Sequence, residues 1–163
     1  QKFKIIANLP YNIGTLLLIE WLKKLDNIES KHLMLQKEVD QRIEAEVNQK
    51  HYGRLSVISN LLCKTKIIFE VSPTIFTPPP KVVSAIIELI PRNIKLENFN
   101  LDIFEKIVAS AFNQRRKMLR SSLKSIFNKD VDSVLRELNI DSSLRAENIT
   151  IEQFIIISQY LQH

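Results

Sequence analysis

Glycine and cysteine are scarce in this sequence, which has two glycines and one cysteine in 163 residues. A single cysteine forms neither an internal disulfide nor a CxxC metal site. Cys63 ends the helical pattern LSVISNLLC, which predicts a buried structural thiol rather than a nucleophile. The histidines are too scattered to suggest metal ligation; they are His32, His51 and His163. These absences exclude a disulfide scaffold and leave no candidate metal site in the sequence.

The sequence also has no long apolar segment. No run approaches the ~18 apolar residues that a membrane span requires. The N-terminus shows no cationic region followed by an apolar core and a small-residue cleavage site. With 45% hydrophobic and 25% charged residues, the composition is that of a soluble globular protein. We therefore expect a cytoplasmic protein that has no membrane partner.

Acidic residues are missing from two stretches, 50–66 and 113–129. The net charge of +5 and the sequence pI near 9.4 by themselves only hint at an anionic partner. The second stretch, called here the basic stretch, contains Arg115, Arg116, Lys117, Arg120, Lys124 and Lys129. The two acid-free stretches are the candidate electrostatic footprint of such a partner.

The first part of the chain alternates β-rich runs with helical patterns. The expected strands are 3–7, 32–35, 66–71 and 83–90. The expected helices are 15–25, 38–47 and 55–64. This alternation predicts an α/β sheet with crossover helices over residues 1–91.

After a polar link at residues 92–100 the strand patterns stop. Apolar residues at helical spacing follow, namely Phe104, Ile107, Val108 and Ala111, and then Val131, Val134, Leu135 and Leu138. Thr150 and Gln153 form a capping box ahead of a final helix. We therefore expect residues 92–163 to form a small all-helical domain.

The basic stretch has the pattern of an amphipathic helix. Its apolar face is expected to contain Leu119, Leu123, Ile126 and Phe127, and its basic face Arg116, Arg120 and Lys124. A solvated charged face is the usual explanation for such a pattern. The absence of interleaved acids removes the i, i+4 ion pairs expected of such a face, so phosphate contact is favoured.

The stretch NLPYN follows the first expected strand. Ligands in open α/β sheets bind beyond the carboxyl ends of strands, so Asn8 is expected to face a crevice. The N6 amine of adenine is a poor nucleophile because its lone pair is delocalised into the ring. The Asn8 side-chain oxygen and the Leu9 carbonyl are suited to accept its hydrogens. Pro10 fixes the turn, and Tyr11 offers a flat face for an unstacked base. The alternative is an ordinary strand-ending turn with a core tyrosine.

The stretch FTPPPKV places an aromatic residue before three prolines. The prolines stiffen the loop in an extended form at low entropic cost, so Phe76 is expected at the mouth of a site. A base held between Tyr11 and Phe76 gains about 1 to 3 kcal/mol for each stacking contact. The alternative is that Phe76 fills the core beneath the loop.

Two further candidate contacts to the RNA backbone are Lys37, within the stretch LQKEV, and Arg42, three residues after it. Acidic residues surround both of them, namely Glu38, Asp40 and Glu44. The start of a surface helix is therefore an equal alternative.

Six sequence blocks occur in the order seen in one enzyme family. They are NLPYNI (8–13), LMLQKEV (33–39), YGRLSV (52–57), FTPPPKVVS (76–84), AFNQRRK (111–117) and LRAENI (144–149). Through them the chain resembles the ribosomal RNA small-subunit adenine N6-dimethyltransferase family, whose members dimethylate two adjacent adenosines near the 3′ end of small-subunit rRNA. Each block alone is weak, but together they cover nearly the whole chain and are specific.

The resemblance implies a fold and a set of site residues. The implied fold is the second half of a Rossmann-like class I methyltransferase sheet, followed by a helical rRNA-binding domain. The implied catalytic residues are Asn8, Leu9, Pro10 and Tyr11, and the implied base-stacking pair is Tyr11 and Phe76. The implied RNA-binding residues are Arg54, Arg115, Arg116, Lys117, Arg120 and Lys124. The implied partners are small-subunit rRNA and an immature 30S-type particle, and we expect a monomer.

The implied cofactor is S-adenosylmethionine, with direct methyl transfer to N6 and no covalent enzyme intermediate. Such enzymes hold it with a glycine-rich loop and an acidic residue, yet Gly14 and Gly53 form no GxG here. We therefore expect the chain to be the C-terminal part of a longer enzyme, inactive alone. Most of the cofactor site is expected upstream, with Asn8 the one contact to the cofactor from this chain.

Two other functions stay open at this point. One is a non-catalytic rRNA-binding factor of the same fold, acting in ribosome assembly or transcription, although a pure binder needs no amine acceptors. The other is a large-subunit rRNA adenine methyltransferase that shares the NLPY motif. The blocks AFNQRRK and LRAENI favour the small-subunit family.

Overall fold

The computed structural model describes residues 1–10, 12–13, 15–94, 97–127 and 130–162. The chain forms two compact units, the first made of Gln1–Ala45 and Ile58–Ile94 and the second of Glu46–Val57 and Lys95–His163. Helix α3 (Arg54–Leu62) therefore gives its first turn to the second unit and the rest to the first.

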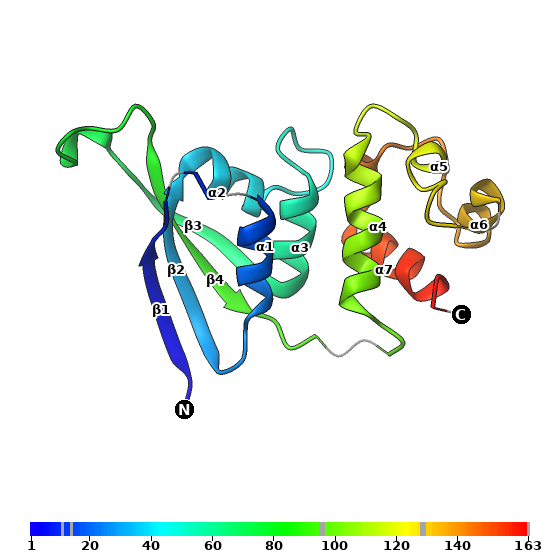
Figure 1. Cartoon of the computed structure of the whole chain (residues 1–163), viewed down its shortest axis with the longest axis horizontal. Helices are drawn as coiled ribbons and strands as arrows, with labels where there is room; N and C mark the ends of the chain where they lie inside the picture. The colour runs from blue at the N-terminus through cyan, green and yellow to red at the C-terminus, as the bar shows by residue number, and fades with distance from the viewer. Residues whose placement is uncertain (11, 14, 95–96, 128–129, 163) are drawn as a thin grey trace. The chain divides into compact units, whose positions relative to one another are not determined.

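The first unit is built on a four-stranded sheet with the strand order β1-β2-β4-β3. The strands are β1 (Phe3–Asn8), β2 (Ile28–Gln36), β3 (Cys63–Val71) and β4 (Ser84–Pro91). Strands β1 and β2 are parallel, and β4 lies antiparallel to both β2 and β3. Helix α1 (Thr15–Lys23) makes the crossover from β1 to β2, and α2 (Lys37–Glu44) follows β2 directly (Figure 1). The predicted α/β sheet is therefore present, although β2 begins four residues before the expected 32.

One face of the sheet carries the core of this unit. Leu33 and Leu35 of β2 and Ile87 and Leu89 of β4 are buried, while the residues between them are partly exposed. This alternation is the two-residue period of a strand covered on one side. Helix α1 contributes its own buried side chains, Leu18, Ile19 and Leu22.

Two buried polar side chains of the first unit are explained by their neighbours. The Lys31 ammonium donates to the carbonyls of Trp21 (2.8 Å) and Lys24 (3.0 Å) at the C-terminal end of α1. It also lies 4.1 Å from the centre of the Trp21 ring. Cys63 is buried, which confirms the predicted buried thiol, but it begins strand β3 and does not end a helix as predicted. Burial raises the pKa of this thiol to about 11.

The second unit is helical. Its elements are α4 (Leu101–Asn113), α5 (Leu119–Ser122), α6 (Val131–Glu137), the short helix η2 (Ala146–Asn148) and α7 (Ile151–Tyr160). Phe104, Phe112 and Phe154 pack edge to face or tilted in its core. The predicted capping box is confirmed, because Thr150 and Gln153 bond each other's backbone N–H groups at the start of α7.

The predicted long helix of the basic stretch is wrong. Helix α5 has only four residues, and residues 114–117 before it form turns and a bend. The reason is that Leu119 N–H donates to Leu144 O (2.6 Å) and Arg120 N–H to Ser142 O (3.1 Å), so these two N–H groups do not continue a helix from the residues before them. Leu119 and Leu123 are buried as expected, but not on one continuous helix.

In the part of the chain that the structure describes, no helix has the length and apolar character needed to cross a lipid bilayer.

Candidate functional site

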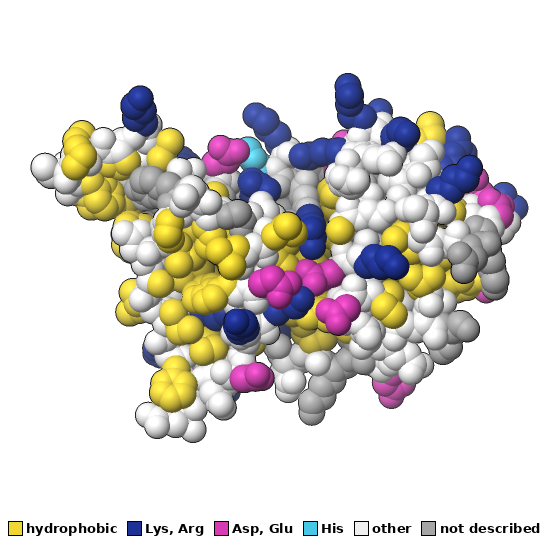
Figure 2. Space-filling view, in the orientation of Figure 1, with side chains coloured by type: hydrophobic (Ala, Val, Ile, Leu, Met, Phe, Trp, Pro, Cys, Tyr) yellow, Lys and Arg dark blue, Asp and Glu magenta, His cyan; other side chains and the backbone are white. Residues whose placement is uncertain are grey.

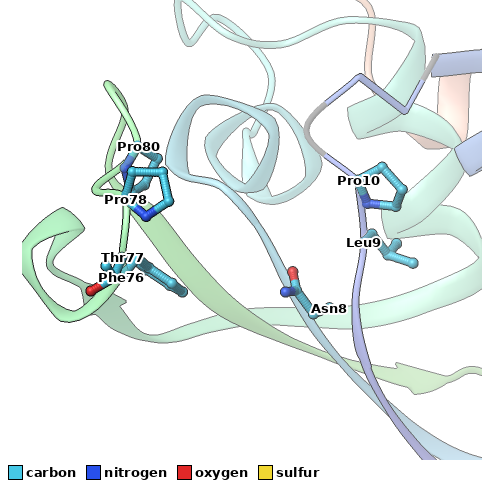
Figure 3. Close-up of a pocket in the computed structure, with 7 residues that line it drawn as sticks. All are labelled: Asn8, Leu9, Pro10, Phe76, Thr77, Pro78 and Pro80. Atoms are coloured by element: carbon cyan, nitrogen blue, oxygen red, sulfur yellow. The ribbon is translucent and has the colours of Figure 1, made fainter.

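A cavity of about 330 Å³ in the first unit joins two of the six sequence blocks. It is lined by Asn8, Leu9 and Pro10 from the end of β1 and by Phe76, Thr77, Pro78 and Pro80 from the loop between β3 and β4. Figure 3 shows these two groups on opposite sides of the cavity. The structure thus brings together the predicted amine acceptors and one predicted stacking residue.

The end of β1 presents Asn8 in an exposed position. Asn8 pairs with Met34 in the sheet, and the Leu9 N–H continues the ladder by donating to Met34 O (3.1 Å). Pro10 then opens a turn, closed by the Ile13 N–H bond to Pro10 O (3.1 Å). The predicted stacking residue Tyr11 lies outside the described residues. The Asn8 backbone is therefore fixed at the carboxyl end of a strand, as the sequence predicts, and its side chain is exposed there.

The opposite wall is fixed by turns within the β3–β4 loop. Ser72 caps the short helix η1 (Pro73–Ile75) by accepting from Thr74 N (3.3 Å), and Phe76 N–H donates to Pro73 O (3.2 Å). The returning end of the loop is tied to α2, because Lys37 N–H donates to Val83 O (3.0 Å). Phe76 is only half-buried and lines the cavity, which favours a base contact over a core plug.

Helix α2 fits the surface-helix alternative at its cations and departs from it at Asp40. Lys37 Nζ pairs with Glu70 on β3 at 2.7 Å, and Arg42 donates to Thr15 Oγ1 at 3.2 Å. Both cations are thus engaged by protein groups. Asp40 is fully buried, and neither of its oxygens has a hydrogen-bond partner among the described residues. The acidic pattern around Lys37 did not reveal this burial.

The basic stretch lies in the second unit, and most of its cations face solvent. Arg116, Lys117 and Lys124 are exposed, and Arg120 is exposed with a long 3.8 Å pair to Asp132. Figure 2 shows Lys and Arg side chains gathered over the α4 and α5 end of this unit. The predicted residue Lys129 lies outside the described residues. Exposed, weakly paired cations such as these remain available to phosphates.

Arg115 differs from its neighbours because its guanidinium bonds within the second unit. Its Nη2 donates to the carbonyls of Lys50 (2.9 Å) and Tyr52 (3.1 Å), and its Nε to Glu147 Oε2 (3.3 Å). These intramolecular bonds give Arg115 a structural role that competes with the predicted RNA contact. The position of Arg115 in the sequence did not show this role.

Arg54 lines a second cavity, of about 410 Å³, together with Ala109, Ser110, Phe112 and Asn113. Its nearest carboxylate is Glu105, with a separation of 3.7 Å between Nη2 and Oε1. That distance is too long for a hydrogen bond. The Arg54 Nε is buried and has no hydrogen-bond partner in the described part of the chain.

The chain that carries these candidate sites has many relatives. The ribosomal RNA adenine dimethylase family matches it over residues 1–163. The chain belongs to this family. The ribosomal RNA small subunit methyltransferase A of Rhodospirillum rubrum is 44% identical over 156 residues, which are 96% of the chain and 54% of that protein. Its counterpart in Ehrlichia ruminantium is 46% identical over 95% of the chain and 59% of that protein.

Solved structures of related enzymes share the fold. A dimethyladenosine transferase from Plasmodium falciparum superposes with a TM-score of 0.79 at 26% identity, covering 99% of this chain and 66% of that one. This likeness confirms the predicted fold class, the second half of a Rossmann-like methyltransferase sheet followed by helices. The chain spans about half the length of the curated relatives that it matches.

Proposed function

We propose that this chain is the substrate-facing part of an rRNA adenine N6-dimethyltransferase, which dimethylates two adjacent adenosines near the 3′ end of small-subunit rRNA. The observation that supports this most is the cavity between Asn8 and Phe76 in a member of the adenine dimethylase family. The proposal includes an immature 30S-type particle as substrate and a cytoplasmic monomer as the working form.

The residues of the cavity have separate tasks. The Asn8 side-chain oxygen and the Leu9 carbonyl accept the two N6 hydrogens, which holds the amine in one orientation and favours pyramidal nitrogen. Pro10 fixes the turn between them and Tyr11. Phe76, with Tyr11 as the predicted partner, stacks on the extruded adenine and offsets the cost of unstacking it. The proton lost from N6 leaves to water.

S-adenosylmethionine is the proposed cofactor, and when bound it supplies an activated methyl group. The exposed Asn8 carboxamide, at the carboxyl end of β1, fits a contact to its methionine end. Neither Gly14 nor Gly53 lies in a GxG, so we propose that the glycine-rich loop is not supplied by these 163 residues. On that basis the isolated chain is inactive.

The direct test is methyl transfer by a full-length chimera, in which this chain is joined to the N-terminal part of the Rhodospirillum rubrum relative. We expect dimethylated adenosines in small-subunit rRNA of immature particles. Methylation of large-subunit rRNA instead would support the alternative enzyme. Small-subunit binding without methylation would support a non-catalytic assembly or transcription factor.

Stacking by Phe76 predicts a graded mutational effect. Phe76→Ala removes a stacking face worth about 1 to 3 kcal/mol, so single-turnover methylation by the chimera should slow in proportion to the reduced flipped-base population. Phe76→Tyr and Phe76→Trp should retain much of the rate because each keeps a π-face. Ile75→Ala is the matched control, since Ile75 is 69% exposed and does not line the cavity. Equal rates for all Phe76 variants would contradict stacking.

The exposed cations predict the salt dependence of RNA binding. For single-stranded RNA, the double variant Arg116→Gln, Lys117→Gln should flatten the plot of log affinity against log salt by about 0.7 for each phosphate that the protein no longer neutralises. Filter binding with this chain measures the slope. Lys106→Gln removes an exposed cation of α4 outside the basic stretch and should change the slope little. An unchanged slope in the double variant would show that Arg116 and Lys117 are solvated surface cations that do not contact phosphates.

A further inference from the structure

The 46–53 loop, which precedes α3, is held to the rest of the second unit at several points. The Arg115 Nη2 donates to two carbonyls of this loop, those of Lys50 and Tyr52. The Arg115 Nε donates to the Glu147 carboxylate in η2. A guanidinium suits this task because its planar array of N–H donors engages several acceptors at once. Arg115 therefore joins the loop to two other segments, the turn after α4 and η2.

Further bonds fix the same loop. Asn48 N–H donates to Glu147 O (3.0 Å), and Asn148 Nδ2 donates to Asn48 Oδ1 (2.9 Å). The Tyr52 hydroxyl donates to Ile149 O at 2.9 Å, and burial raises the pKa of Tyr52, which keeps that hydroxyl protonated. Three of the sequence blocks, YGRLSV, AFNQRRK and LRAENI, thus meet in one cluster of the second unit.

The residue placed by this cluster is Arg54. It follows Tyr52 by two positions and begins α3, where Gly53 N–H donates to Ser56 Oγ (3.0 Å). Arg54 lines the cavity of about 410 Å³ beside Ser110 and Asn113, with a buried Nε that has no hydrogen-bond partner among the described residues. The Arg54 side chain stays 28% exposed, and its one ion pair among the described residues is the long 3.7 Å contact with Glu105, so its exposed part suits a phosphate oxygen.

We propose that Arg115 is a positioning residue for RNA binding: it holds the 46–53 loop so that Arg54 presents its guanidinium to an RNA phosphate. The phosphate ligands of the basic stretch then begin at Arg116. This inference rests on the proposed RNA-binding function and gives Arg115 a different task within it.

Arg115→Lys distinguishes direct phosphate neutralisation from positioning of the loop, because lysine keeps the charge but lacks the planar array of N–H donors. If Arg115 only neutralised a phosphate, lysine would replace it with little change in affinity or salt slope. As a positioning residue, Arg115→Lys should weaken binding of a single-stranded RNA about tenfold and flatten the salt slope by about 0.7, the value of one phosphate no longer neutralised by Arg54. Arg136→Lys, at an exposed arginine of α6 outside the basic stretch, is the matched control and should bind like the wild type.

A double-mutant cycle tests whether Arg115 acts through Arg54. Arg54→Gln combined with Arg115→Lys should bind no more weakly than Arg54→Gln alone, because the Arg54–phosphate interaction is already absent. Additive effects on binding would overturn the proposal, as would wild-type binding by Arg115→Lys. Circular dichroism spectra establish that each variant is folded.

Asn48→Gly is a second test of the role of the 46–53 loop, and it leaves Arg115 intact and changes no charge. Glycine readily adopts the positive φ of Asn48 (68°), but it lacks the side-chain oxygen that accepts from Asn148. We expect weaker RNA binding and a flatter salt slope in the same direction as for Arg115→Lys, and unchanged binding would overturn the loop's role. Failure of the proposed RNA function is distinguishable, because the Arg116→Gln, Lys117→Gln variant would then keep the wild-type slope.

Discussion

Asn8→Ala is expected to slow single-turnover methyl transfer by about 10²- to 10³-fold, the reduction typical of removing one preorganised polar group that bonds to a reacting atom. The proposed Asn8 acceptor acts mainly in the transition state, when the N6 nitrogen becomes pyramidal and its hydrogens more acidic. RNA affinity should stay nearly unchanged, because the phosphate contacts proposed for the second unit would supply most of it. A fall in the rate with constant affinity identifies an interaction made in the transition state.

The measurement uses the full-length chimera with immature small-subunit particles, beside filter binding on the same variants. Asn12→Ala is the matched control, because Asn12 belongs to the same NLPYN stretch and is exposed but does not line the cavity. Wild-type methylation by Asn8→Ala would show that NLPY is only a strand-ending turn. An equal reduction in Asn12→Ala would show that the turn, not the carboxamide, is what matters.

The cavity was predictable from the sequence because its two walls follow from local chemistry. Asn8 ends a β-rich run, and the prolines after Phe76 stiffen a loop, so each wall depends on residues adjacent in the chain. Their meeting depends on the strand order β1-β2-β4-β3 of the sheet. Tertiary contacts of this kind are predictable when motif order identifies the fold.

The roles of individual charged residues were not predictable in the same way. Arg115 and Arg116 are adjacent and equal in charge, but Arg115 bonds to Lys50 and Tyr52 while Arg116 is exposed. Both arginines are exposed, and which of the two bonds within the unit depends on distant carbonyl groups, which carry no signal in the sequence. The helix expected over the basic stretch failed for a similar reason, because the N–H groups of Leu119 and Arg120 bond to residues 142–144.

Asp40 is the strongest departure from sequence expectation, since three acidic residues around Lys37 suggest a solvated helix. Helix α2 packs on β2, β3 and β4, and Asp40 lies wholly within that packing. Burial, and then the nearby Glu44 carboxylate, raise the pKa of Asp40 from its ordinary 3.8 to about 8. Of the other charged groups on these elements, Lys37 pairs with Glu70, and Glu44 accepts from Ile67 N. Asp40 is therefore protonated in the folded chain at neutral pH.

This raised pKa predicts how stability depends on pH. The folded chain retains a proton that the unfolded chain releases between about pH 4 and pH 8, so stability should fall as pH rises through that window and level off above it. Asp40→Asn removes the titration. At pH 7 it should raise the free energy of unfolding by about 3 to 4 kcal/mol, and near pH 4 by little.

Urea unfolding followed by the fluorescence of Trp21 measures this effect in the right unit, because Trp21 is the one tryptophan of the chain and lies in α1. Asp26→Asn is the matched control, since Asp26 is exposed in the same unit and its removal should leave the pH dependence of unfolding in place. A wild-type stability that is flat across the window, or one that rises with pH, would show that Asp40 is ionised in the folded state. In that case a donor must reach its carboxylate, and Asp40→Asn would destabilise the chain at pH 7 instead, because the charged hydrogen bond would be removed.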